Sequence, residues 1–147
     1  MPKVGELAPD FEAPTAPNGS PLKLSQLRGK PVVLYFYPEA DTPGCTTESK
    51  GFRDHYPEFR AKNVEVVGVS VDDVQKQCDF AEKYSLPFPL VADTSKSVAK
   101  AYGALRESGR ARRVTFLIGP DGRIMDIVDV PKADPHVARA RELFLGR

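Results

Sequence analysis

Residues 32–45 of this chain read Val-Val-Leu-Tyr-Phe-Tyr-Pro-Glu-Ala-Asp-Thr-Pro-Gly-Cys, and this stretch decides the fold. Its first six residues are aliphatic or aromatic and are followed by a proline, a pattern typical of a short buried strand. The last four carry the signals of a helix start, because Thr42 can act as N-cap and Pro43 suits the first helical position. The stretch therefore predicts a strand that passes through a short turn into a helix.

Cys45 falls in the first turn of this predicted helix. A helix N-terminus presents unpaired N–H groups and the positive end of the helix dipole, and both favour a thiolate over a thiol. A spacing of three residues places the Thr42 hydroxyl on the same face of the turn as the Cys45 sulfur. A buried, inert cysteine is the usual alternative for a free thiol, but the strand–turn–helix setting favours a nucleophile.

The composition excludes several classes of function. The 147 residues fit one domain, 1–147, and the net charge of +1 gives no electrostatic reason to expect nucleic acid or a membrane as partner. Residues 1–6 lack the apolar core of a signal peptide, and no apolar segment approaches membrane-spanning length, so we expect a cytoplasmic protein. Cys45 and Cys78 form neither a CxxC motif nor a Cys/His cluster, so we expect no metal site.

Strand and helix patterns alternate after a proline- and glycine-rich start with short strands. We expect further strands over 64–71, 90–91, 114–119 and 123–129, the last two joined as a hairpin by residues 120–122. We expect helices over about 43–62, 73–84, 95–102 and 135–145. Pro57 should kink or break the first helix, and Asp72 or Asp73 should cap the second. The order predicts an α/β fold with a mostly parallel central sheet, a C-terminal antiparallel hairpin and flanking helices.

The peroxiredoxins share an active-site signature in which a proline is followed four residues later by a threonine and three residues after that by a cysteine. This sequence matches the signature at Pro38, Thr42 and Cys45. The longer segment from Phe36 to Glu48 resembles the peroxiredoxin Q branch, also called the bacterioferritin comigratory proteins. Four other segments are similar to that family in their expected places: 5–11, 68–70, 86–90 and 113–118. The resemblance covers nearly the whole chain and implies a thioredoxin-like fold with the N-terminal extension of a peroxiredoxin.

The resemblance implies a thiol-dependent peroxidase with an antioxidant role in cell redox homeostasis. It would reduce hydrogen peroxide and organic hydroperoxides through a sulfenic acid at Cys45, with thioredoxin or another thiol donor as its reductant. No cofactor is implied, because the cysteine carries the redox chemistry, and the resemblance favours a monomer. By the same resemblance, Thr42 binds the peroxide, Pro38 shields the sulfur from water, and Arg113 is the active-site arginine. A planar guanidinium can hold a thiolate and a peroxide oxygen together.

Other charged residues have more than one interpretation. Glu48 lies three residues after Cys45 and could orient Arg113, although a solvent-facing glutamate is an open alternative. We expect three further arginines to lie in a solvated, flexible loop: Arg106, Arg110 and Arg112. Neither histidine, His55 or His136, has a nucleophile or a metal ligand at a spacing that would indicate a shared site, and we expect both at the surface.

The chain departs from the branch at the second, resolving cysteine. Many peroxiredoxin Q proteins carry it five residues after the first, where this chain has Lys50. Others place it in the following helix, at a position that aligns with Ala81, one turn after Cys78. Three residues along a helix keep roughly the same face, so Cys78 is a candidate resolving cysteine. A cysteine that faces the core is the alternative.

Two other functions are compatible with a thioredoxin-like fold. A catalytically idle module for protein binding or holdase activity is disfavoured by the retention of Pro38, Thr42, Cys45 and Arg113. A general dithiol reductase needs two close cysteines, and this sequence lacks them.

Overall fold

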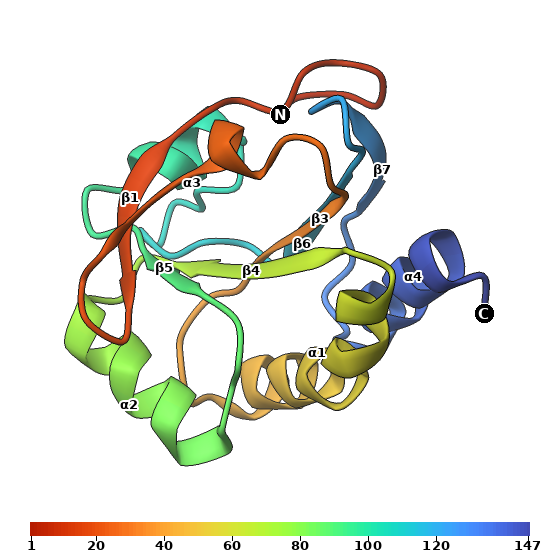
Figure 1. The fold of residues 1–147 in the computed structure, drawn as a ribbon. Helices are drawn as coiled ribbons and strands as arrows, with labels where there is room; N and C mark the ends of the chain where they lie inside the picture. Colours follow the sequence, from red (N-terminus) through yellow and green to blue (C-terminus); the bar gives the residue numbers. More distant parts are fainter.

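The computed structural model describes residues 1–147 and contains one sheet with helices on both faces (Figure 1). The strands are β1 Glu12–Ala16, β2 Pro21–Lys23, β3 Val32–Phe36, β4 Glu65–Ser70, β5 Leu90–Ala92, β6 Val114–Ile118 and β7 Ile124–Val128. The helices are α1 Pro43–Ala61, α2 Val74–Tyr84, α3 Ser97–Ala101 and α4 Asp134–Leu145, with a 3-10 helix, η1, over Leu24–Leu27. The strands lie in the order β2-β1-β5-β4-β3-β6-β7, so β3 has two strands on one side and four on the other.

Parallel pairing is confined to the three central strands. β3 pairs with β4, and β4 pairs with β5, in parallel. β6 runs antiparallel to β3 and forms the predicted C-terminal hairpin with β7. The turn of this hairpin needs Gly122, which adopts a left-handed φ of 84° that only glycine reaches without strain. The predicted α/β fold is confirmed, and β1 and β2 belong to the N-terminal extension, with β1 antiparallel to β5.

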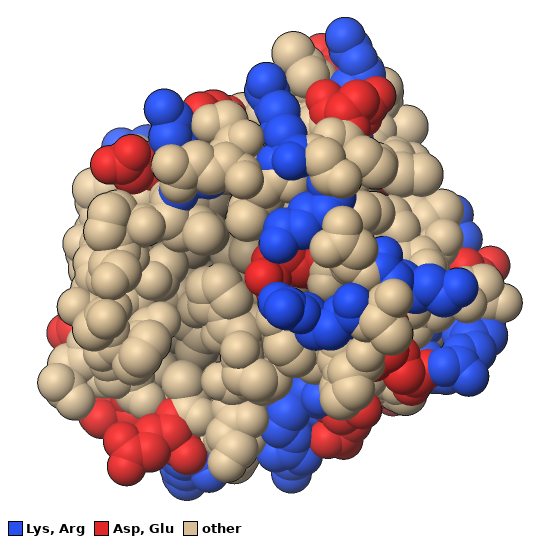
Figure 2. Space-filling view, in the orientation of Figure 1, with Lys and Arg blue, Asp and Glu red and all other residues tan.

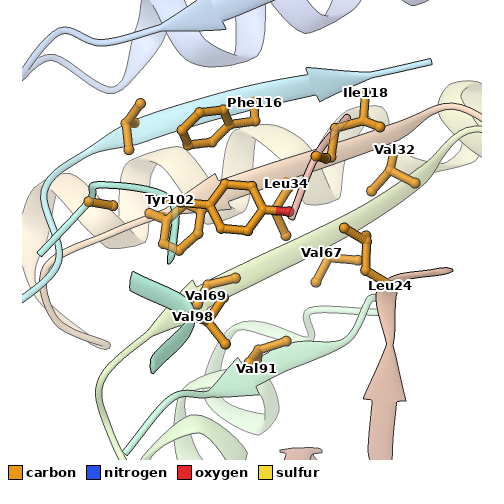
Figure 3. Packing of buried hydrophobic residues seen from close by; sticks show 14 of the residues in the cluster. Leu24, Val32, Leu34, Val67, Val69, Val91, Val98, Tyr102, Phe116 and Ile118 are labelled. Atoms are coloured by element: carbon orange, nitrogen blue, oxygen red, sulfur yellow. The ribbon is translucent and has the colours of Figure 1, made fainter. Parts of the chain in front are cut away.

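β3 is buried on both faces, which explains why every residue of 32–37 is aliphatic or aromatic. Its even-numbered residues face a core that α3 and η1 cover, where Leu34 packs with Tyr102 and Phe116 (Figure 3). Its odd-numbered residues, such as Tyr35, face a second core that α1, α2 and α4 cover. The burial of both faces fixes the end of β3, and therefore the position of the turn that follows it.

Two predicted features of the helices have different outcomes. α1 continues through Pro57, so of the predicted kink or break the break is wrong. Proline removes one main-chain hydrogen bond, but Phe52 and Phe59 on either side are fully buried, and this packing holds the helix together. The predicted cap of α2 is confirmed, because the Asp73 carboxylate accepts a hydrogen bond of 2.8 Å from the Lys76 amide.

On the face shown in Figure 2, charged side chains of both signs lie along the rim and over the right half, and a broad area on the left is uncharged. This distribution agrees with a net charge of +1 and offers no extended basic field to a polyanion on that face. None of the helices combines the length and the apolar character that crossing a bilayer would require.

Candidate active site

The turn between β3 and α1 carries the candidate nucleophile. α1 begins at Pro43, so Cys45 lies in its first turn, as predicted. The Cys45 side chain is only 1% exposed, and its sulfur is a free thiol. The backbone N–H groups of Gly44 and Cys45 donate to no other group of the protein, as is usual in the first turn of a helix. The turn therefore combines a buried sulfur with two unpaired N–H donors.

Thr42 occupies the N-cap position, but its side chain does not cap the helix. Its backbone is extended and its carbonyl accepts a 2.8 Å hydrogen bond from the Thr46 amide, as expected of an N-cap residue. Its hydroxyl donates instead to the carbonyl oxygen of Glu39, 2.7 Å away. Because the only hydroxyl proton is used there, Thr42 Oγ1 can act only as an acceptor toward a bound molecule.

The turn is tied to α2 and to the end of β4. Asp41 has a left-handed backbone (φ 61°), which aspartate tolerates better than most residues. Its carboxylate accepts hydrogen bonds from Lys83 at 3.0 Å and Tyr84 at 2.8 Å, and these bonds hold the pKa of Asp41 below its ordinary value. The Ala40 amide donates to Asp72 over 2.8 Å. The residues just before α1 therefore depend on groups far along the chain.

Arg113 reaches Cys45 from the start of β6. Its Nη2 lies 3.4 Å from the Cys45 sulfur, its Nη1 lies 2.7 Å from Glu48 Oε1, and its Nε donates to the Pro131 carbonyl at 3.0 Å. A Cβ atom on Gly44 would lie 2.9 Å from Nη2, so glycine leaves the room that this contact needs. Burial acts to lower the pKa of Arg113, but Glu48 and Cys45 hold it above its ordinary value.

Glu48 is completely buried, so the solvent-facing alternative is wrong. Burial raises the pKa of its carboxyl group to about 8, against the opposing effect of the neighbouring Arg113. Oε1 binds Arg113, whereas Oε2 has no hydrogen-bond partner. The contact that we expected between Glu48 and Arg113 is therefore present, and the carboxyl group that makes it is buried.

The expected surface position of His136 is wrong, because its side chain is fully buried. Nδ1 lies 2.8 Å from Thr115 Oγ1 and 3.6 Å from Glu48 Oε2, and Nε2 lies 2.8 Å from the Val130 carbonyl. His136 precedes Ala140, which is also buried, by one helical turn and shares its face of α4, but the sequence alone does not show that this face packs on α1. His55 is partly exposed and lies 3.0 Å from a Glu58 carboxylate oxygen.

An open pocket of about 670 Å³ lies beside Arg113, and Pro38 forms part of its wall. Other lining residues come from the loop before β6 and the segment after β7: Leu105, Arg106, Glu107, Arg112, Asp129, Val130 and Pro131. The arginines Arg106, Arg110 and Arg112 are exposed, as expected. Two of them form surface ion pairs, Arg110 with Glu39 at 3.2 Å and Arg112 with Asp129 at 3.1 Å.

Cys78 lies on α2 at the edge of the core and is only half-buried. Its thiol donates to the Pro17 carbonyl over 2.7 Å and faces an open hollow of about 700 Å³ that Ala81 and Phe88 also line. Lys50, at the other family position for a second cysteine, is exposed. The structure therefore does not bring Cys78 to Cys45, and it leaves the Cys78 thiol accessible.

Comparisons with known proteins agree on one family. The model of the AhpC/TSA family matches residues 4–127. A putative peroxiredoxin, bcp, of Coxiella burnetii is 42% identical over 143 residues, which cover 92% of this chain and 94% of that protein. The crystal structure of the peroxidoxin BcpB of Mycobacterium tuberculosis has a TM-score of 0.92 and 38% identity, and covers 98% of this chain and 97% of that one.

A third similar protein has been studied with respect to its substrate. It is the bacterioferritin comigratory protein of Xanthomonas campestris, whose alkyl peroxide reduction activity was addressed with trapped intermediate and ligand complexes. Its structure has a TM-score of 0.86 and 28% identity, and covers 92% of this chain and 90% of that one.

The close approach of Gly44 to Arg113 can be tested by Gly44→Ala. The added methyl group should push the guanidinium away from the sulfur and lower the alkylation rate of Cys45 by iodoacetamide near neutral pH roughly three- to tenfold. Alanine is a better helix former than glycine, but the displaced guanidinium also moves from the buried Glu48 carboxyl group, so the free energy of unfolding in urea is measured beside the alkylation rate. The alkylation rate in concentrated urea serves as control and should equal that of the wild type. An unchanged rate in the folded variant would contradict the account of Gly44.

Proposed function

Because the chain belongs to the AhpC/TSA family, in its Bcp or peroxiredoxin Q branch, we propose that Cys45 is the nucleophile of its peroxidase reaction. The protein is a thiol-dependent peroxidase. The observation that best supports the role of Cys45 is its contact with Arg113, 3.4 Å from the sulfur, at an unpaired helix N-terminus.

In the proposed reaction the Cys45 thiolate attacks the terminal oxygen of the peroxide and the O–O bond breaks. Sulfur is oxidised to a sulfenic acid, and the other peroxide oxygen leaves with the bond's electron pair and takes up a proton. The product is water from hydrogen peroxide and an alcohol from an alkyl hydroperoxide. Since the Xanthomonas campestris relative has been studied for alkyl peroxide reduction, we include both kinds of peroxide as substrates.

Each neighbour of Cys45 has a proposed role that follows from its free donors and acceptors. Thr42 Oγ1 has only lone pairs left, so it would accept a hydrogen bond from the O–H group of the peroxide. Arg113 would stabilise the thiolate and the negative charge that moves onto the leaving oxygen. Glu48 would fix the guanidinium from the opposite side. Pro38 would limit the access of water from the open pocket.

Cys78 would return the oxidised Cys45 to its reduced state. The observation that supports this role is that the Cys78 thiol is only half-buried. Its thiol would attack the sulfenic acid, form a Cys45–Cys78 disulfide and release water, and thioredoxin or a similar dithiol would then reduce that disulfide. A disulfide needs Cα atoms within about 7 Å. The Cys78 thiol now faces Pro17, so the first turn of α1, the helix α2, or both would have to unwind.

We further propose that residues 1–147 form a single catalytic domain that acts as a monomer in the cytoplasm, with an antioxidant role in redox homeostasis. The continuous hydrogen-bonded sheet supports one domain. Two free thiols support a reducing compartment. The monomer rests on the resemblance to peroxiredoxin Q alone.

Replacing Cys45 by serine tests the nucleophile. Cys45→Ser should lower the rate of hydrogen peroxide consumption roughly a thousandfold or more, because a serine hydroxyl is hardly ionised near neutral pH and has no activating base here. Stopped-flow measurement with one equivalent of peroxide checks this, and circular dichroism checks the fold. Cys78→Ser, the matched control, should still be oxidised by that equivalent. Rapid consumption by Cys45→Ser would refute the assignment, and an inert wild type would favour the idle binding module.

The resolving role of Cys78 predicts the product of one turnover. One equivalent of peroxide should leave the wild type as an intramolecular disulfide, two hydrogen masses lighter than the reduced protein, under nonreducing mass spectrometry. Cys78→Ser should accumulate the sulfenic acid, one oxygen mass heavier, and lose turnover with thioredoxin. If the wild type itself accumulates the sulfenic acid and both proteins turn over equally, the enzyme works with one cysteine.

A further inference from the structure

A buried polar cluster lies next to Arg113, whose Nη1 contacts one of its members. It consists of Glu48 from α1, Thr115 from β6 and His136 from α4, and none of the three is exposed at all. Helices α1 and α4 approach closely here, because a Cβ atom on Gly51 would lie 2.9 Å from the Val137 side chain. The missing side chain at Gly51 therefore allows the imidazole to reach the carboxyl group.

The hydrogen bonds of His136 determine where its proton lies. Nε2 is 2.8 Å from the Val130 carbonyl oxygen, which can only accept, so Nε2 carries a proton. In the neutral imidazole Nδ1 then has a lone pair, which accepts from the Thr115 hydroxyl at 2.8 Å. The same Nδ1 lies 3.6 Å from Glu48 Oε2.

Glu48 Oε2 is left without a partner by this arrangement. It is buried and accepts no hydrogen bond, while Oε1 is held by Arg113 at 2.7 Å. A buried, unpaired carboxylate oxygen opposite a nitrogen lone pair is an unfavourable arrangement. A proton on Oε2 removes the conflict, because Oε2 can then donate toward the Nδ1 lone pair, in competition with the Thr115 hydroxyl.

We propose that Glu48 and His136 share one proton, and that this proton determines how much of the Arg113 charge is available to Cys45 and the peroxide. The proposal rests on the proposed function of Cys45 and makes His136 a positioning residue for that reaction. With the proton present, Glu48 is close to neutral and competes weakly for the guanidinium. When the proton is lost to solvent, the Glu48 carboxylate competes with the thiolate and with the leaving oxygen for the same guanidinium.

The surrounding charges give the direction of the pH dependence. Burial raises the pKa of Glu48 to about 8 and lowers the pKa of His136, so the cluster favours a protonated carboxyl beside a neutral imidazole. Arg113 from β6 lowers both pKa values, and Asp129 after β7 raises that of His136. Of the other ionisable groups, Tyr35 on β3 interacts with Glu48, and Cys45 on α1 interacts with Arg113. Peroxide reduction should therefore slow as the pH rises through about 8.

The pH profile of peroxide reduction tests the shared proton through Glu48→Gln, which keeps the shape of the protonated acid and cannot ionise. We expect the second-order rate constant of the wild type to fall roughly fivefold between about pH 7 and about pH 9.5, the size expected for weakening one charge-assisted hydrogen bond. In Glu48→Gln this alkaline fall should shrink to less than about twofold. The same fall in both proteins would overturn the proposal.

Two further variants separate a proton effect from a general charge effect. Thr115→Val removes the hydroxyl that competes for His136 Nδ1, so the alkaline fall should move to higher pH. Glu142→Gln removes an exposed carboxylate on α4 and should leave the profile as in the wild type. A fall at unchanged pH in Thr115→Val, or a flattened profile in Glu142→Gln, would count against the shared proton.

A direct measurement makes the proposal independent of turnover. The ¹³C resonance of the Glu48 carboxyl carbon and the ¹⁵N resonances of His136 can be followed by NMR in the wild type, with Glu48→Gln and His136→Gln for assignment. We expect the Glu48 resonance to keep its protonated position beside a neutral His136 near neutral pH. An ionised Glu48 beside a neutral His136 would overturn the proposal, whereas a wild type without peroxidase activity would refute only the proposed function.

Discussion

The contact of the Arg113 guanidinium with Cys45 is the interaction on which the rest of the site depends. Its three hydrogen-bond partners lie on α1 and on the segment after β7: the Cys45 sulfur, Glu48 and the Pro131 carbonyl. The residue itself comes from the start of β6, which pairs with β3 in the middle of the sheet. Local sequence around the cysteine cannot assemble this arrangement. It requires β6 to pair in the correct register with β3 and β7, and α1 to follow β3 at the same end of the sheet.

The groups around the Cys45 sulfur are expected to contribute more to the rate of peroxide reduction than ionisation of the thiol does. An ordinary cysteine thiol is a few per cent thiolate near neutral pH, so complete ionisation gains at most about thirtyfold in nucleophile, and the nucleophilicity of a thiolate falls as it becomes less basic. Preorganised donors that bind developing charge contribute about a hundredfold or more each in other enzymes. Here such donors would be Arg113 and the unpaired N–H groups of Gly44 and Cys45.

The sequence predicts those features of the fold and site that depend on local pattern or on a family motif. The strand over 32–37, the helix start at Pro43 and the cap at Asp73 follow from apolar runs and from helix-capping preferences, and the structure contains all three. Features that depend on packing were not predictable in this way. Pro57 stays within α1 because buried aromatic residues flank it, and His136 is buried because α4 packs on α1 beside Gly51. The Thr42 hydroxyl turns to a carbonyl three residues back rather than to the helix.

The most direct measurement of the central claim is a comparison of two quantities in Arg113→Lys. Lysine keeps the positive charge but lacks the planar guanidinium, whose N–H groups donate to Cys45, Glu48 and Pro131 at the same time. The thiolate fraction can be followed by iodoacetamide alkylation against pH, and peroxide reduction can be followed by stopped flow. We predict that peroxide reduction slows by at least about tenfold more than the loss of thiolate explains, because the donors to the leaving oxygen are also lost. A rate loss equal to the loss of thiolate would contradict the account and would limit Arg113 to stabilising the thiolate.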